Sequence, residues 1–157
     1  MLLFLKNLLF TVLVPGTVGV YIPVFVFSHA PVGFSPGTVA AVLLLLIGTS
    51  VYLWCLWDFA SFGRGTPAPI DAPKHLVIRG LYRYSRNPMY IGVLSVICGW
   101  SLLFQSLSIA IYGLAVATCF HLFVVFYEEP HLKLVFGPSY EQYCAQVGRW
   151  LSFRLRF

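Results

Sequence analysis

The sequence predicts an all-α integral membrane protein with about four transmembrane helices. Hydrophobic residues make up 59% of its 157 positions and charged residues only 10%, whereas about a quarter of the residues in soluble domains are charged. Its mean hydropathy is +0.85. Uncharged stretches long enough for a spanning helix, which needs about 20 residues, recur along the chain. We therefore expect one membrane-embedded domain over residues 1–157, with no separate soluble catalytic domain.

Four apolar segments account for the expected crossings. They lie at about residues 8–27, 39–57, 88–104 and 107–127. The first contains Pro15 and Pro23, so we expect a kinked helix that packs closely against its neighbours. It is too long for the apolar region of a signal peptide, and we expect it to be retained. Only Gln105 and Ser106 interrupt the last two segments, which predicts an antiparallel helical hairpin.

Basic residues gather on one predicted side of the membrane. The net charge is +5, and the ten Lys and Arg residues lie in short segments that flank apolar runs. Such residues orient membrane proteins, so we expect the termini, the loop 61–87 and the tail 128–157 on the cytoplasmic side. Nucleic-acid binding is not expected. We expect the protein in the cytoplasmic (inner) membrane of a prokaryote, in contact with the lipid bilayer and with no obligate protein partner.

Two further patterns concern packing. Tyr140, Tyr143, Cys144 and Val147 follow i, i+3, i+4, i+7 spacing, which predicts an amphipathic tail helix at the membrane interface. The four cysteines show no CxxC or other metal-ligand spacing. We expect them to be buried thiols, and we expect no metal site.

The loop before the third apolar segment contains the strongest candidate binding residues. Between Lys74 and Tyr90, basic and aromatic side chains are interleaved. Asn87 suits an N-cap and Pro88 the first helical position. A helix start offers free N–H groups and the positive end of the dipole to a carboxylate or phosphate, and tyrosines suit a flat base. A juxtamembrane segment with orienting arginines and an aromatic belt would explain the same composition.

An acidic pair and a histidine lie near the end of the last apolar segment. Glu128 and Glu129 repel each other and oppose the negative end of their own helix, so a cationic group should offset them. A solvated helix end that Pro130 terminates is the alternative. His121 is either a hydrogen-bonded packing residue or a group that faces the substrate. His75, in the loop, is the stronger candidate by position.

Taken in order, these residues are similar to those of a known group of membrane enzymes. The matching set is Leu76-Val77, Gly80, Tyr82, Arg86-Asn87-Pro88-Met89-Tyr90, Glu128-Glu129, Phe136-Gly137, Tyr140, Tyr143 and Arg149. The series resembles the isoprenylcysteine carboxyl methyltransferase family and its phospholipid methyltransferase relatives, over about residues 64–152. The first two apolar segments match only in being apolar.

The resemblance implies a pocket for S-adenosylmethionine. Its contacts would come from the loop, the start of the next helix and the acidic pair, namely Lys74, His75, Leu76, Val77, Tyr82, Asn87, Pro88, Met89, Tyr90 and Glu128. The helix start would face the methionine carboxylate, the tyrosines would pack the adenosine, and Glu128 would face the ammonium or sulfonium charge. Arg86 would fix the loop or pair with Glu129.

The expected reaction is methyl transfer to a lipid-like or amphiphilic acceptor at the cytoplasmic membrane face. Such a transfer needs chiefly alignment of the two reactants and exclusion of water. An amine acceptor would also need deprotonation. The candidate catalytic residues are His75, His121, Glu129 and Arg86.

Two departures from the family bear on this expectation. Asn87 stands where many relatives have His, a change that suits capping but not proton transfer. Val124 stands where the eukaryotic carboxyl methyltransferases have an arginine that faces the substrate carboxylate, so we do not expect a prenylcysteine acceptor. One alternative is a non-catalytic membrane protein of the same fold that binds a lipid or a partner helix. Another, haem ligation by His29 and His121, is disfavoured by their predicted positions on opposite sides.

Overall fold

The computed structural model describes residues 2–27, 36–63 and 75–151, and every regular element within them is helical. The elements are α1 (Leu2–Leu13), the π-helical η1 (Thr17–Val26), α2 (Pro36–Asp58), the π-helical η2 (Phe59–Gly63), the 3-10 turn η4 (Gly80–Arg83), α3 (Pro88–Leu103), α4 (Leu107–Phe123), the π-helical η5 (Val124–Glu128), α5 (Glu129–Phe136) and α6 (Pro138–Gln146). The predicted all-α class is confirmed.

Three continuous helical stretches of the described residues are long and apolar enough to cross a membrane. They are Leu5–Val26, Gly37–Phe62 and Leu107–Phe136. The first begins earlier than predicted and ends one residue earlier, the second is longer at both ends, and the last begins as predicted but continues to Phe136. α3 has 16 residues and measures about 24 Å at 1.5 Å per residue, somewhat less than the ~30 Å core of a bilayer. The chain is an integral membrane protein, and a fourth crossing through α3 stays a prediction.

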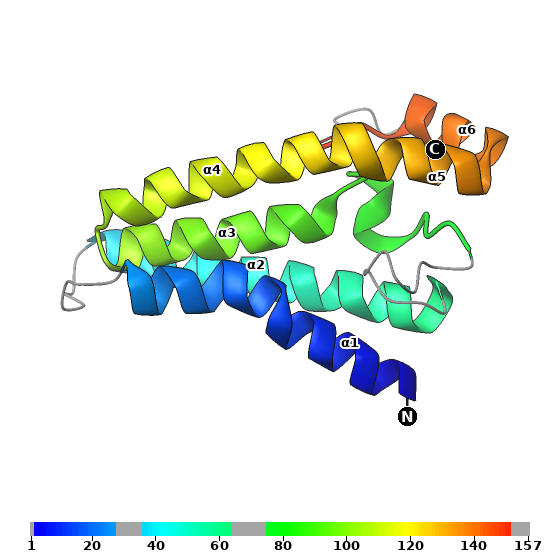
Figure 1. Cartoon of the computed structure of the whole chain (residues 1–157). Coiled ribbons are helices and arrows are strands. Elements are labelled where there is room, and N and C mark those ends of the chain that lie inside the picture. The colour runs from blue at the N-terminus through cyan, green and yellow to red at the C-terminus, as the bar shows by residue number, and fades with distance from the viewer. Residues whose placement is uncertain (1, 28–35, 64–74, 152–157) are drawn as a thin grey trace.

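α3 lies between α2 and α4, and α1 diverges from the other helices towards its N-terminal end (Figure 1). The turn between α3 and α4 lies at one end of the bundle, and α5 and α6 lie at the other. In that turn Gln105 adopts a φ of 48°. Ser106 caps α4, and its Oγ accepts a hydrogen bond from the N–H of Ile109 at 3.4 Å. The predicted α3–α4 hairpin is confirmed.

α2 and α3 approach each other backbone to backbone at a contact that we call the glycine seam. It consists of Gly48 on α2 and Gly92 on α3. A Cβ atom added at Gly48 would lie 2.6 Å from the carbonyl oxygen of Gly92, and one added at Gly92 would lie 2.9 Å from that of Gly48. The hydrophobic effect contributes little between membrane helices, where close packing of small residues drives association. The seam therefore fixes the position of α3.

The loop before α3 is anchored on the end of α2. Gly80 adopts a φ of +55°, and a side chain there would collide with the carboxylate of Asp58. Asp58 is buried, and its Oδ1 lies 3.6 Å from Nε of Arg79. The guanidinium of Arg79 lies over the ring of Phe62, 3.4 Å from its centroid. Glycine tolerates both the positive φ and the close approach, so η4 can rest directly on α2.

The first long helix bends where α1 meets η1 (Figure 1). Pro15 lies at this junction, between the end of α1 and the start of η1, and Pro23 lies inside η1. Proline removes a backbone donor, and membrane helices accommodate the loss by local π adjustments. The predicted kink is present.

The last long helix continues through the acidic pair instead of ending there. α4, η5 and α5 form one stretch from Leu107 to Phe136, so Pro130 does not terminate it. Pro130 lies in the first turn of α5, directly after the π-turn η5, where a missing N–H is tolerated. Glu128 lies about 30 Å from the start of α4 at 1.5 Å per residue, which matches the thickness of a hydrocarbon core. The segment from the start of α4 to the acidic pair is thus long enough to cross the hydrocarbon core once.

The predicted tail helix is present as α6, but protein covers its apolar face. Tyr140, Tyr143 and Val147 are buried in one cluster, against which residues of the loop and of α5 pack. The i, i+3, i+7 pattern therefore reflects contact with the rest of the chain and not with lipid.

The expectation of four buried thiols is wrong for three cysteines. Cys55 is buried and Cys144 half-buried, whereas Cys98 and Cys119 are exposed on α3 and α4. Free cysteine behaves as a small hydrophobe, so an exposed apolar helix surface accepts it as readily as a protein core does.

Candidate active site

A cavity of about 520 Å³ lies where the loop before α3, the start of α3 and the last long helix meet. Phe10 and Val14 of the first helix and Tyr140 and Tyr143 of α6 complete its wall. Apolar and aromatic side chains provide most of the lining. Its charged residues are Arg86, Glu128 and Glu129. The volume is within the range of small-molecule sites.

The cavity brings together most of the residues predicted to hold a cofactor. Its lining includes Leu76, Val77, Tyr82, Asn87, Met89, Tyr90 and Glu128. Pro88 is buried without lining it, His75 is exposed outside it, and Lys74 lies outside the described residues. The predicted catalytic residues divide in the same way, because Arg86 and Glu129 line the cavity while His75 and His121 do not.

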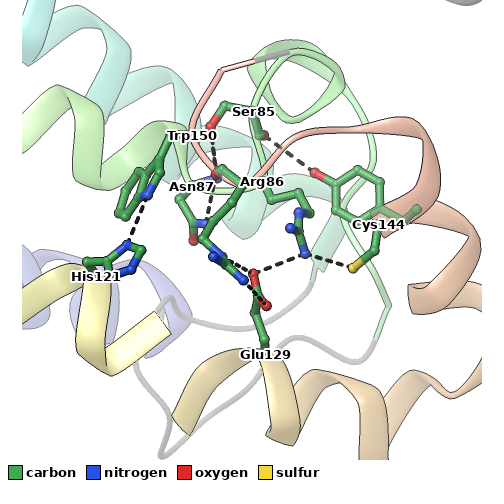
Figure 2. A network of polar contacts seen from close by, with 9 residues as sticks. Ser85, Arg86, Asn87, His121, Glu129, Cys144 and Trp150 are labelled. Atoms are coloured by element: carbon green, nitrogen blue, oxygen red, sulfur yellow. Dashed lines mark hydrogen bonds and ion pairs between the residues drawn. The ribbon is translucent and has the colours of Figure 1, made fainter. Parts of the chain in front are cut away.

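His121 contacts the tail instead. Its Nδ1 accepts a hydrogen bond from the indole N–H of Trp150 at 3.3 Å, and the two rings stack with their centroids 6.1 Å apart. Figure 2 shows this pair to one side of the contacts around Glu129. The side chain of His121 thus joins α4 to the tail. Its position does not support a contact with an acceptor in the cavity.

Glu129 is held between two arginines (Figure 2). Arg149 donates two hydrogen bonds to it, from Nε to Oε1 at 2.7 Å and from Nη2 to Oε2 at 3.0 Å, which is the bidentate geometry of strong arginine–carboxylate pairs. Nη1 of Arg86 lies 3.0 Å from Oε1, the pairing that the resemblance implies. The hydrogen bonds to Glu129 raise the pKa of Arg149. This carboxylate is therefore neutralised within the fold.

The backbone of the tail also holds the loop. Nδ2 of Asn87 donates a hydrogen bond to the carbonyl oxygen of Arg149 at 3.0 Å. The N–H of Arg86 donates to the carbonyl oxygen of Gly148, also at 3.0 Å. We call these contacts, together with the two ion pairs of Glu129, the loop–tail clasp. It joins the residues before α3 to α5 and to the segment after α6.

Asn87 occupies the N-cap position of α3, as predicted, but its side chain does not cap the helix. The amide is used in the clasp, and the backbone N–H of Asn87 donates to Oγ of Ser85 at 3.0 Å. The first N–H groups of α3 thus have no side-chain acceptor. Because Asn87, Met89 and Tyr90 line the cavity, this uncapped helix start borders it and favours an anion there.

Tyr82 forms part of the cavity wall next to α2. It is buried, and its ring meets that of Phe59 edge-on, with centroids 5.5 Å apart. Its carbonyl oxygen accepts a hydrogen bond from the hydroxyl of Tyr143 at 2.6 Å. Burial raises the pKa of Tyr82 well above its usual range, and the neighbouring Cys55 and Glu128 add to the effect. The hydroxyl therefore stays neutral at physiological pH.

Glu128 differs from its neighbour in having no basic partner among the residues that the structure describes. The hydroxyl of Tyr90 donates to its Oε2 at 2.9 Å, and the ring of Tyr90 packs on that of Phe120 at 4.6 Å. Over residues 2–27, 36–63 and 75–151, no lysine or arginine forms an ion pair with Glu128. A carboxylate in a largely apolar cavity is costly unless a cation or further donors satisfy it. The site is thus suited to a cationic ligand group.

Sequence reasoning missed several residues that complete the cavity. Tyr127 and His131 line it from the last long helix, within one turn of Glu128, so helical spacing from the acidic pair could have found them. Phe10 and Val14 line it from the first helix. Nothing in that uniformly apolar segment distinguishes these two positions from their neighbours.

Comparison with known proteins places this site in a family. A family model described as phospholipid methyltransferase matches residues 37–139. The matched region contains η4, the start of α3 and the acidic pair, and it begins after the first helix. No curated protein and no solved structure matches the chain.

Proposed function

This chain belongs to the phospholipid methyltransferase family, and from that premise we propose that it transfers a methyl group from S-adenosylmethionine to a lipid-like or amphiphilic acceptor. Membership confirms the family that the sequence resembles and supports methyltransferase activity in a membrane. The proposal adds the methyl donor, the residues that hold it, and the side of the membrane at which it meets the acceptor.

The observation that carries the proposal is the carboxylate of Glu128, which has no ion pair among the described residues, beside the uncapped start of α3. When bound, S-adenosylmethionine supplies a methyl group on a positively charged sulfonium, next to an ammonium and a carboxylate. Glu128 would hold the positive charge, and the N–H groups at the start of α3 would hold the carboxylate. The rings of Tyr82 and Tyr90 would pack the adenosine and border the sulfonium.

Glu129 and Arg86 have a positioning role in this proposal. Glu129 pairs with both Arg86 and Arg149 within the clasp, so it is not free to act as a base. Two guanidinium groups and one carboxylate leave the clasp with a net positive charge, and Nε of Arg86 has no hydrogen-bond partner among the described residues. The clasp would keep the loop, α3 and Glu128 in register, and alignment of the two reactants is the main requirement of a methyl transfer.

The acceptor is proposed to enter from the bilayer between the first and last long helices. Phe10 and Val14 on one side and Phe120 and Phe123 on the other line the cavity and suit a hydrocarbon chain. Val124, 1% exposed, also lines it and offers no charge. An unpaired carboxylate there would cost several kcal/mol, so we expect a farnesylcysteine analogue to be a poor acceptor.

We assign the cavity to the cytoplasmic face. The described loop residues and the tail, which contain Arg79, Arg83, Arg86, Lys133 and Arg149, gather at one end of the bundle (Figure 1). Basic residues concentrate on the cytoplasmic side of membrane proteins. The turn between α3 and α4 would then face the opposite side.

Calorimetry on the purified protein in nanodiscs tests the methyl donor. The wild type is expected to bind S-adenosylmethionine or its demethylated product. Glu128→Ala should weaken binding by about ten- to a hundredfold, since a charge-assisted contact contributes about 1.5–3 kcal/mol. Tyr90→Phe, which removes only the hydroxyl that contacts Glu128, should weaken it less. Absence of binding to the folded wild type at millimolar concentration would contradict the proposal.

Transfer of labelled methyl into a total lipid extract tests turnover. Recovery of the label in a lipid supports methyltransferase activity. Binding of the donor without transfer to any lipid would favour the non-catalytic protein of the same fold.

A further inference from the structure

The cavity contains one imidazole among the described histidines, and it belongs to His131. This residue lies in α5, one turn beyond Glu128, and lines the cavity. Its ring stacks on that of Tyr127, with centroids 6.1 Å apart and an interplanar angle of 7°. Both side chains are exposed at the protein surface, so they lie at a rim of the cavity. With the cavity on the cytoplasmic face, as proposed above, this rim would meet water. A ring at that position would contact solvent on one side and the cavity on the other.

The other groups of the cavity that could accept a proton are already committed. Glu129 holds two arginines in the clasp. Glu128 accepts the hydroxyl of Tyr90 and, under the proposed function, faces the positive charge of the methyl donor. Tyr82 is neutral because burial raises its pKa. Neither His75 nor His121 lines the cavity. Cys119 also lines the cavity, but a thiol sulfur is a weak acceptor. Among the described lining residues, an unprotonated ring nitrogen of His131 is therefore the base that stays available.

We propose that His131 removes the proton of an amine-bearing acceptor, an inference that rests on the proposed function. The acceptor arrives as an ammonium, and one N–H proton passes to the unprotonated ring nitrogen of His131. The freed lone pair forms the N–C bond to the methyl carbon, while the C–S bond breaks and its electron pair stays on sulfur. The proton then leaves His131 for water at the rim.

The surroundings of the cavity favour this transfer. Most of its lining is apolar or aromatic, and burial in such a site disfavours the charged form of an amine. The imidazolium that forms is exposed at the protein surface, where water on the cytoplasmic side would solvate it. Tyr127, stacked parallel to the ring, acts as a positioning residue that holds the imidazole at the rim.

Methyl transfer to phosphatidylethanolamine vesicles tests the inference, with His131→Gln and His131→Ala compared with the wild type. His121→Ala is the matched control, because its imidazole is also exposed but lies outside the cavity. We expect turnover to fall roughly a hundredfold in both His131 variants, in the range of general-base effects. Affinity for S-adenosylmethionine should stay within about threefold, and His121→Ala should keep its rate. Free imidazole should restore part of the rate of His131→Ala and leave His131→Gln, whose larger side chain fills the site, less affected.

The outcomes separate this inference from the function on which it rests. Equal rates for wild type and His131→Gln, or a rate of His131→Ala that free imidazole does not raise, would overturn the role of His131 while leaving the methyltransferase intact. Methylation of a farnesylcysteine analogue but not of phosphatidylethanolamine would overturn the amine assignment. Failure to methylate either compound would overturn it as well. Failure of the wild type to bind S-adenosylmethionine would overturn the proposed function itself, and the inference with it.

Discussion

The glycine seam and the loop–tail clasp hold the same helix, α3, by opposite means. At the seam, Gly48 and Gly92 bring two backbones so close that an added Cβ would lie 2.6 Å from a carbonyl oxygen. At the clasp, Glu129 takes hydrogen bonds of 2.7 and 3.0 Å from Arg149, and the side chain of Asn87 bonds the tail backbone. The first contact depends on the absence of side chains and the second on charged ones.

The difference follows from the surroundings of each contact. Apolar surface gains nothing by moving from lipid to protein, so the membrane part of α3 is held by dispersion and close backbone packing. Near the boundary, polar groups are available, and charge-assisted hydrogen bonds that exclude water are worth more than exposed ones. Held at both places, the start of α3 keeps a fixed position relative to Glu128, which a donor site needs.

The largest loss of stability should come from a substitution in the glycine seam. Gly48→Ala is expected to lower the free energy of unfolding by about 3 kcal/mol, the upper end of overpacking costs, because its Cβ would also meet the backbone nitrogen of Val96 at 2.9 Å. Thermal unfolding in detergent measures it. The matched control is Gly19→Ala, whose Cβ would meet only Cγ1 of Val93, at 3.4 Å. Equal melting temperatures for the two variants would show that the seam is not tight.

Disrupting the clasp should lower the free energy of unfolding by less than disrupting the seam. The loss should appear for Glu129 and not for the adjacent Glu128. Glu129→Gln removes the charge from a side chain that is 15% exposed and leaves two guanidinium groups without a counter-charge. We expect a loss of about 1.5–3 kcal/mol in the free energy of unfolding. Glu128→Gln, whose residue has no ion pair in the part of the chain that the structure describes, should not lower it, because neutralising a carboxylate in a largely apolar cavity removes a desolvation cost. The same loss in both variants would contradict the division of roles.

The helices of this fold could be predicted from apolarity, but their lateral contacts could not. An uncharged run of about 20 residues specifies a spanning helix, and Gln105 and Ser106 specify where the hairpin turns. In such runs no polar face marks the buried side, which is why Cys98 and Cys119 were expected inside. The continuation of the last helix through Pro130 depends on η5, and a π-turn has no sequence signature that distinguishes it from an α-helical turn.

The candidate site could be predicted where it uses residues that are rare in membrane segments. Glu128 and Asn87 are of this kind and lie in the cavity. The clasp was less predictable, because Asn87 bonds a backbone carbonyl that any residue at position 149 would supply. His121 and His131 lie on either side of the acidic pair, and only the helix face, shifted by the wide turn of η5 between them, determines which one reaches the cavity.

The smallest expected effect concerns an ion pair that resembles the clasp in chemistry but not in burial. Nζ of Lys133 on α5 lies 3.9 Å from Oε1 of Glu141 on α6, and the two side chains are 56% and 65% exposed. Exposed pairs of this kind contribute little, because water and salt screen the charges and two long side chains must be ordered. A double-mutant cycle with Lys133→Ala and Glu141→Ala should give a coupling energy below about 0.5 kcal/mol.

The same cycle on Arg149 and Glu129 should give about 1.5 kcal/mol or more, since their side chains are only 33% and 15% exposed and bond in a bidentate geometry. Raising the salt concentration should reduce the first coupling towards zero and change the second much less. Both pairs begin at α5, where Lys133 is joined to α6 and Glu129 to the segment after α6. Equal coupling energies in the two cycles would show that burial does not set the strength of the clasp, and the contrast between seam and clasp would then need another cause.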